Sequence, residues 1–325
     1  MAHARLVAVV ALLAWGVAAP AGAAPLKGEQ RVLIVLATAG VRPYSVNDVQ
    51  QVASAAAAFY QTSSFGQLRL RIDVTPWVTA FTADPGCRVV SQSTLDALMD
   101  PARLAAEAIG FFPTDYDEVM YDVAGSHCGF WGTTYGHDVL LTRQPNVELL
   151  VHELGHTFGL GHSRASPCAV GCNVVDPGDP FSPMGTGDQL IDFSAYEKVV
   201  LGWLPEPRHI TAGGRFVLAP ARTAGKTARA IVIDSADGQF WLEYVARPFR
   251  GLLVRFVDTF HPVPPFAPAA ILITDPGRHG RDWIARGETY RADQLFRVRL
   301  LTATAKQGQI RIWLTPAARQ PSLRR

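Results

Sequence analysis

The spacing of apolar residues in the first half of the chain predicts strands that alternate with helices. Arg31–Ala39 is a continuous apolar run, as in a strand buried on both faces, and Gln67–Val74 alternates like a half-exposed strand. Between them, Val46–Tyr60 repeats its apolar residues with a helical period, and Ser45 stands where a helix N-cap is expected. The same pattern predicts helices over Thr94–Ile109 and from about Val147, and strands over Tyr116–Val123 and Val139–Thr142. This order indicates an α+β domain with a mixed sheet.

The pattern changes at the stiff connector Leu204–Pro207, after which short apolar runs are separated by turns. Seven of these runs have the length of strands: Arg215–Leu218, Ala228–Ile233, Phe240–Val245, Leu252–Val257, Ala270–Thr274, Leu295–Leu301 and Gln309–Leu314. Short strands at this spacing favour a β-sandwich. We therefore expect an α+β domain over residues 25–204 and an all-β, sandwich-like domain over residues 205–325.

The first residues of the chain, 1–24, have the three parts of a secretory signal. Arg5 supplies a positive start, Leu6–Val17 is an apolar stretch, and Ala21–Ala23 offers a small-x-small cleavage site. The apolar stretch is too short to cross about 30 Å of hydrocarbon as a helix, and no later segment is long and apolar enough either. We expect cleavage near Ala23, a secreted or periplasmic mature protein, and no membrane span.

The charges of the chain are nearly balanced. Its 325 residues include 30 Lys and Arg and 28 Asp and Glu, a net charge of +2, and no long run of one sign occurs. This balance offers no argument for a nucleic-acid partner. Arg297, Arg299 and Arg311 alternate with apolar residues, and we interpret them as the solvated face of a sheet.

The four cysteines, Cys87, Cys128, Cys168 and Cys172, suit an exported chain with two disulfides. Three pairings are possible, and the sequence alone does not choose among them. We prefer Cys168–Cys172 with Cys87–Cys128, because the first pair is only four residues apart in a loop that contains glycine. A zinc site made of cysteines is less favoured, since the spacing lacks a pair of C-x-x-C motifs.

One segment carries most of the chemical information: an H-E-x-x-H-x-x-G-x-x-H pattern from His152 to His162. On a helix, His152 and His156 are four residues apart and can bind one ion from adjacent turns. Gly159 can end the helix, which lets His162 return as a third ligand. Three neutral imidazoles leave the fourth position of a tetrahedral Zn²⁺ to water, as in catalytic zinc sites.

Glu153 stands beside the first ligand, where its carboxylate can reach a water on the zinc. Zinc lowers the pKa of such a water, and the carboxylate can take its proton as the water attacks a carbonyl. Glu153 is thus the predicted catalytic residue, with His152, His156 and His162 as zinc ligands. The alternative is a binding or adhesion protein whose zinc site is not catalytic. Within the sequence, no nucleophile elbow, phosphate loop or dinucleotide motif appears, so no other cofactor site is predicted.

This motif resembles that of the metzincin clan of zinc endopeptidases at every fixed position. The clan has a methionine turn beneath its ligands. Here Ser182–Gly185 contains Met184, the only methionine in the sequence after the motif. Within the clan, the chain looks most like the gametolysin-like metallopeptidases, with immune-inhibitor-A-like secreted proteases as nearer cousins. The supporting segments are Ser64–Leu68, Cys128–Gly132, Phe193–Lys198 and Leu201–Trp203, and more loosely Trp241–Tyr244 and Gly287–Tyr290.

The resemblance spans about Arg31 to Trp203 and implies a metzincin-like catalytic domain with a mixed sheet. An edge strand of that sheet would lie over the cleft and pair with an extended protein or peptide substrate, near Val139–Thr142. One departure is Thr186, because some metzincins have a tyrosine at this position that approaches zinc. Tyr196 could replace it only if the fold brought it near.

Two further groups of residues are weaker candidates. His127 and His137 could line the cleft, although a histidine in a loop is more often simply exposed. Asp176, Asp179 and Asp188 could hold Ca²⁺ near the methionine turn, although acidic residues without EF-hand spacing usually belong to turns. The sequence predicts a secreted zinc endopeptidase and says nothing about its oligomeric state.

Overall fold

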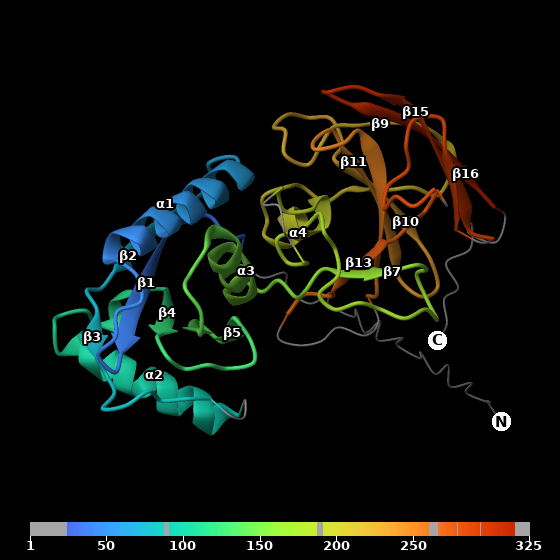
Figure 1. The fold of residues 1–325 in the computed structure, drawn as a ribbon. Coiled ribbons are helices and arrows are strands. Elements are labelled where there is room, and N and C mark those ends of the chain that lie inside the picture. The colour runs from blue at the N-terminus through green and yellow to red at the C-terminus, as the bar shows by residue number, and fades with distance from the viewer. Residues whose placement is uncertain are drawn as a thin grey trace, which may run out of the picture.

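A computed structural model describes residues 25–87, 91–186, 191–259, 266–277, 279–292 and 294–315. The predicted signal over residues 1–24 lies outside them. The chain forms a helix-and-sheet half from its first residues and an almost purely β half from its last (Figure 1). The α+β class is thereby confirmed.

The first half is built on a sheet with the order β2-β1-β4-β6-β5, to which a short strand β3 adds beside β1. Neighbouring strands run parallel, except that β5 is antiparallel to β6, so the predicted mixed sheet is confirmed. The strands are β1 (Gly28–Thr38), β2 (Leu68–Val74), β3 (Val78–Thr79), β4 (Glu118–Val123), β5 (Gly132–Tyr135) and β6 (Asp138–Leu141). The apolar run predicted to be buried on both faces is β1, in which residues 32–37 are fully buried.

Helices cover both faces of this sheet. They are α1 (Val46–Ser63), α2 (Gln92–Glu107) and α3 (Val147–Thr157), with a 3-10 turn over Pro113–Asp115, whereas the short α4 (Ala195–Val200) packs against the sandwich half. Alternate residues of β1 divide the core: Val32, Ile34 and Leu36 pack with α1 and α3, whereas Leu33 and Val35 pack with α2. The predicted cap of α1 is confirmed, because the Ser45 hydroxyl accepts from the backbone N–H of the third helical residue and a reciprocal bond completes a capping box.

The second half consists of two sheets around one core. The larger has the order β7-β13-β12-β11-β10-β8 and the smaller has the order β14-β15-β16-β9. Their strands are β7 (Arg164–Ser166), β8 (Arg208–His209), β9 (Gly214–Leu218), β10 (Ala230–Asp234), β11 (Gln239–Val245), β12 (Gly251–Val257), β13 (Ala270–Ile273), β14 (Thr289–Ala292), β15 (Phe296–Ala303) and β16 (Gly308–Leu314). Phe240 and Leu242 of one sheet and Phe296 and Val298 of the other belong to the same buried cluster. All seven predicted strands are present, and their packing is sandwich-like.

Strand β7 links the two halves. It follows the histidine motif directly, yet it pairs in parallel with β13 of the larger sandwich sheet. The proposed boundary at 204/205 stays a prediction, and residues well before it already contribute to the second half.

The prediction of which strand forms the free edge of the first sheet was wrong. The segment near Val139–Thr142 contains β6, and β5 covers its outer side through antiparallel pairing. The two strands are joined by a tight turn at Gly136, whose φ of +61° suits a residue without Cβ. The edge of this sheet is therefore β5, which the sequence pattern did not reveal.

The preferred disulfide pairing is confirmed, with bonds Cys87–Cys128 and Cys168–Cys172. Among the described residues, no helix has the length and apolarity needed to cross a bilayer.

Candidate metal centre

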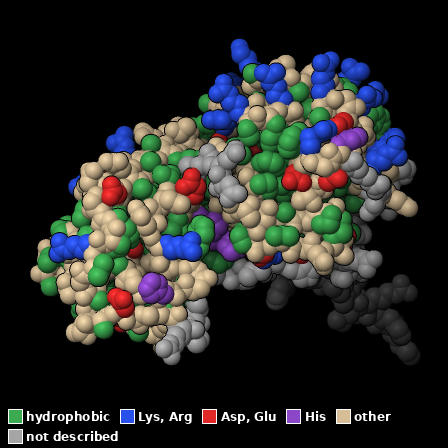
Figure 2. Space-filling model, viewed as in Figure 1, with side chains coloured by type: hydrophobic (Ala, Val, Ile, Leu, Met, Phe, Trp, Pro, Cys, Tyr) green, Lys and Arg blue, Asp and Glu red, His purple; other side chains and the backbone are tan. Residues whose placement is uncertain are grey.

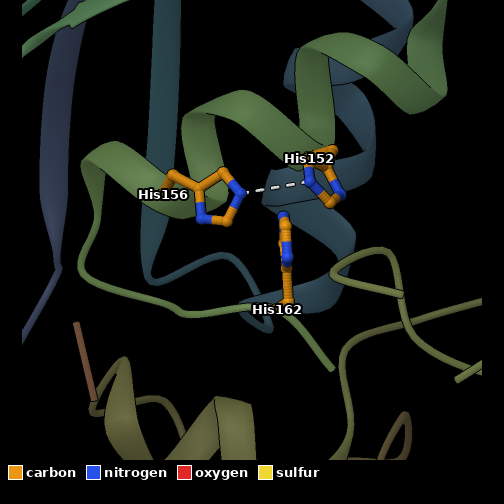
Figure 3. A group of neighbouring side chains, drawn as sticks. All are labelled: His152, His156 and His162. Carbon is orange, nitrogen blue, oxygen red and sulfur yellow. Dashed lines mark hydrogen bonds between the residues drawn. The ribbon is translucent and has the colours of Figure 1, made fainter. Parts of the chain in front are cut away.

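Helix α3 brings two of the predicted ligands together. The side chain of Asn146 caps its first turn, and the two histidines, His152 and His156, face the same side because they are four residues apart. Gly159, with φ of +89°, reverses the chain beyond the helix, and His162 returns to face the other two. Figure 3 shows the three rings converging, and one nitrogen of each lies within 4.8 Å of the others.

The outer nitrogen of each ring already has a partner. The Nδ1 atoms of His152 and His156 are each 2.8 Å from a carbonyl oxygen, of Pro183 and Leu160 respectively. The Nδ1 atom of His162 is 2.7 Å from Oδ1 of Asp176. Because these partners are acceptors, the Nδ1 atoms carry the protons, and the Nε2 lone pairs stay free to bind a metal.

The centre favours neutral rings. Burial lowers the pKa of His152 to about 4 and that of His156 to about 3, well below the usual range of histidine. The Nε2 atoms of these two rings are only 3.1 Å apart, and two lone pairs at this distance repel unless a cation lies between them. The donor set therefore fits a metal ion such as zinc, which binds neutral imidazole nitrogens.

Glu153 lies next to these ligands, buried between α3 and β5. Its Oε2 accepts a hydrogen bond of 2.9 Å from the Thr134 hydroxyl. Burial raises the pKa of this carboxyl to about 7, and the Thr134 bond acts in the opposite direction. A Cβ on residue 132 would lie 2.5 Å from Oε1 of Glu153, so Gly132 is what lets the edge strand pass so closely over the carboxylate.

A cavity of about 390 Å³ opens at the three histidines. One wall is β5, including Gly132 and Thr134, and the opposite wall comes from the sandwich half as residues 266–269. The Phe266 ring lies 5.3 Å from the His156 ring, centroid to centroid, and the Ala267 N–H donates to the carbonyl of Gly159. Both halves of the molecule therefore shape this cavity.

Met184 is fully buried against the helix that carries the first two histidines. Its sulfur lies against α3 at Gly155, where a Cβ would approach it to 2.3 Å. Its carbonyl accepts from the backbone N–H of Ser163, 2.6 Å away, directly after the third histidine. Met184 is thus a packing residue of α3, and its role as a methionine turn stays a prediction.

A buried ion pair fastens this region to the sandwich. Arg255 of β12 contacts Asp179 at 2.9 Å and Glu243 at 2.7 Å, and Asp179 also accepts from the Ser163 hydroxyl. Asp176 in turn binds His162 and Arg164. Two of the three proposed calcium ligands thus have other partners, and Asp188 lies outside the described residues.

The remaining predicted residues lie elsewhere. Neither His127 nor His137 lines the cavity, and His137 pairs with Glu118. Tyr196 does not line it either; its hydroxyl donates to the carbonyl of Pro268, 2.6 Å away, and so supports the sandwich wall. Sequence reasoning missed Thr134 and Phe266, because one stands in a short polar strand and the other is 104 residues beyond His162.

No protein-family model matches the chain, and no curated protein sequence matches it. Among solved structures, it is similar to one titled "Structure of a chaperone-substrate complex", with 14% identity and a TM-score of 0.32. The match covers 53% of this chain and 30% of that chain. A TM-score this low carries no argument about fold or function.

Proposed function

We propose that the protein is a secreted zinc-dependent endopeptidase with a metzincin-like first domain. The observation that carries the proposal is the convergence of three free Nε2 lone pairs beside the buried carboxylate of Glu153, in an open cavity under a sheet edge. The two disulfides and the predicted signal support secretion.

His152, His156 and His162 would hold the zinc through their Nε2 atoms. When bound, zinc would supply Lewis acidity toward a carbonyl oxygen and would make a water molecule more acidic. Glu153 would accept the proton of the attacking water, and the Thr134 hydroxyl would hold the carboxylate in place.

Strand β5 would position the substrate. Its outer side has no partner strand in the described sheet, and its residues line the cavity opposite the sandwich wall. An extended peptide could add to this edge through backbone hydrogen bonds, which would place its carbonyls over the histidines. Such binding recognises the peptide backbone more than particular side chains, and it therefore suits proteins and peptides as substrates.

The test is Glu153→Gln in the full-length protein. Because the carboxylate is not among the proposed ligands, the variant should retain zinc, and because an amide cannot accept the proton, peptide hydrolysis should fall roughly 10²–10⁴-fold. Zinc content by mass spectrometry and cleavage of a diverse peptide pool give the two measurements.

The matched control is Glu148→Gln, the same chemical change in the first turn of α3, which should keep both zinc and activity. A wild type that binds zinc yet cleaves nothing would instead support the binding or adhesion protein. An active Glu153→Gln variant would refute the mechanism.

A further inference from the structure

The outer face of the smaller sandwich sheet carries five exposed arginines. Arg297 and Arg299 lie on β15, and Arg311, Arg215 and Arg291 lie on β16, β9 and β14. We call this set the arginine face. Lys and Arg side chains gather over the part of the molecule where β9, β15 and β16 lie (Figures 1 and 2).

The strand register places these charges directly opposite one another. Arg299 of β15 pairs with Arg311 of β16, which pairs on its other side with Arg215 of β9. Arg297 faces Arg291 across β14 and β15. Three cross-strand pairs therefore join like charges, an arrangement that destabilises a sheet.

Among the described residues, no acidic side chain is recorded as an ion-pair partner of these arginines. A solvated strand face accounts for one arginine on an exposed strand, but not for three opposed pairs without counter-charges. The interpretation of Arg297, Arg299 and Arg311 as a solvated strand face is confirmed by their exposure. The opposed pairs go beyond it, because anions from outside the chain would relieve their repulsion.

One aromatic side chain, Trp313, and a hollow lie beside these arginines. The guanidinium carbons of Arg311 and Arg297 lie 4.9 Å and 5.4 Å from the centroid of the Trp313 ring. A hollow of about 450 Å³ beside them is lined by residues 211–214, Arg311 and Trp313. A Cβ on Gly213 would lie 2.7 Å from the carbonyl oxygen of Ile312, so this glycine lets the turn at the hollow pack closely on β16.

We propose that the arginine face binds a linear anionic polysaccharide. The row Arg299–Arg311–Arg215 crosses three strands, which lie about 4.8 Å apart. The row thus presents one guanidinium per strand to a polymer that carries one charge on each successive sugar. Guanidinium groups match the geometry of carboxylate and sulfate groups. Trp313, whose ring Arg297 and Arg311 already contact, lines the adjoining hollow, where a sugar would lie.

The observations favour this partner over other polyanions. A face that binds a lipid surface usually adds large apolar side chains that enter the interface, and here only Val217 is an exposed large apolar residue. Single-stranded nucleic acid usually stacks successive bases on several aromatic rings, and on the described part of this face Trp313 stands alone.

The test measures binding of the full-length protein to heparin and to polygalacturonate over a range of salt concentrations. Replacing three arginines together (Arg215→Gln, Arg299→Gln and Arg311→Gln) should weaken binding by about tenfold or more and flatten its salt dependence. The matched control replaces three exposed arginines of the first half (Arg42→Gln, Arg69→Gln and Arg71→Gln). It changes the net charge equally and should bind like the wild type.

Three further measurements sharpen the result. Trp313→Leu should weaken binding while leaving its salt dependence unchanged, since no charge is lost. Thermal unfolding of the triple variant should match or exceed that of the wild type, because like charges are removed. Cleavage of a short neutral peptide should be unchanged, which separates this proposal from the proposed peptidase activity.

The proposal is overturned if the triple variant binds both polysaccharides as well as the matched control does, or if the wild type binds neither. It is also overturned if the wild type prefers vesicles of phosphatidylglycerol or single-stranded DNA to both polysaccharides. Unchanged binding by Trp313→Leu would refute the role proposed for Trp313 in contacting a sugar.

Discussion

The candidate metal centre has two parts that differ in how they are held: a first arm, His152 and His156, and a second arm, His162. His152 and His156 stand on one rigid helix, and their Nδ1 atoms donate to backbone carbonyls. His162 stands on an irregular segment, its side chain is 37% exposed, and its partner is the side chain of Asp176. A single helix fixes the positions of His152 and His156, whereas the position of His162 depends on contacts with distant parts of the chain.

The sandwich half supplies those contacts. The strand β7 begins two residues after His162 and pairs with β13, and the neighbouring Ser163 binds Asp179, which Arg255 of β12 holds in place. The predicted ligands are therefore divided between the two halves. Changes to the second arm should alter metal binding without disturbing α3, and this difference can be tested.

The largest effect should come from removing the ligand of the second arm. The variant His162→Ala leaves two imidazoles on an intact helix, so it should lose most of its zinc at equilibrium. The measurement is zinc content after dialysis, with His209→Ala as a control for loss of a histidine elsewhere. Full zinc occupancy in His162→Ala would show that the third ligand is misassigned.

A smaller loss is expected from Asp176→Asn. The amide can still accept from His162, but the negative charge that orients and polarises the ring is gone, so zinc affinity should fall about 10–100-fold. Asp234→Asn is the matched control, because Asp234 contacts His209 with similar geometry outside the centre. Equal zinc affinities in the two variants would mean that Asp176 does not support the second arm.

The disulfides allow a comparison by stability. Cys168–Cys172 closes a short loop between β7 and Asp176, whereas Cys87 and Cys128 are 41 residues apart. In the loop-entropy model, removing the short bridge costs about 2 kcal/mol and the long one about 4 kcal/mol. Denaturant unfolding of the two double-serine variants measures both. If removing Cys168–Cys172 lowered the free energy of unfolding more than removing Cys87–Cys128 did, the segment that carries His162 would depend on its disulfide more than loop entropy predicts.

The smallest effect is expected at Met184. Replacement by Leu roughly conserves volume and should cost less than about 1.5 kcal/mol of stability, with little change in zinc affinity. Gly155→Ala should cost more, because its Cβ meets the methionine sulfur inside a closed core. If Met184→Leu abolished zinc binding while the fold survived, the side chain would have a role beyond packing.

Local sequence patterns predicted the first arm better than the second. The helical period and the histidine spacing placed His152 and His156 on one face, and short apolar runs between turns located all seven expected sandwich strands. Strand β5 escaped detection because Gly132–Tyr135 is polar and short, so its position depends on pairing with β6. The partnership of Arg255 with Asp179 joins residues 76 positions apart, and no local pattern encodes it.

The parallel pairing of β7 with β13 also bears on how such a protein can be divided or recombined. A chain cut at residue 204 would leave β7 as an unpaired edge and Asp179 as a carboxylate without its cation, both beside the third histidine. The two halves are therefore not interchangeable modules. A graft of a foreign sandwich would have to carry its own match to residues 164–166 and its own counterpart of Arg255, or the grafted protein would lose the support of His162 together with a domain.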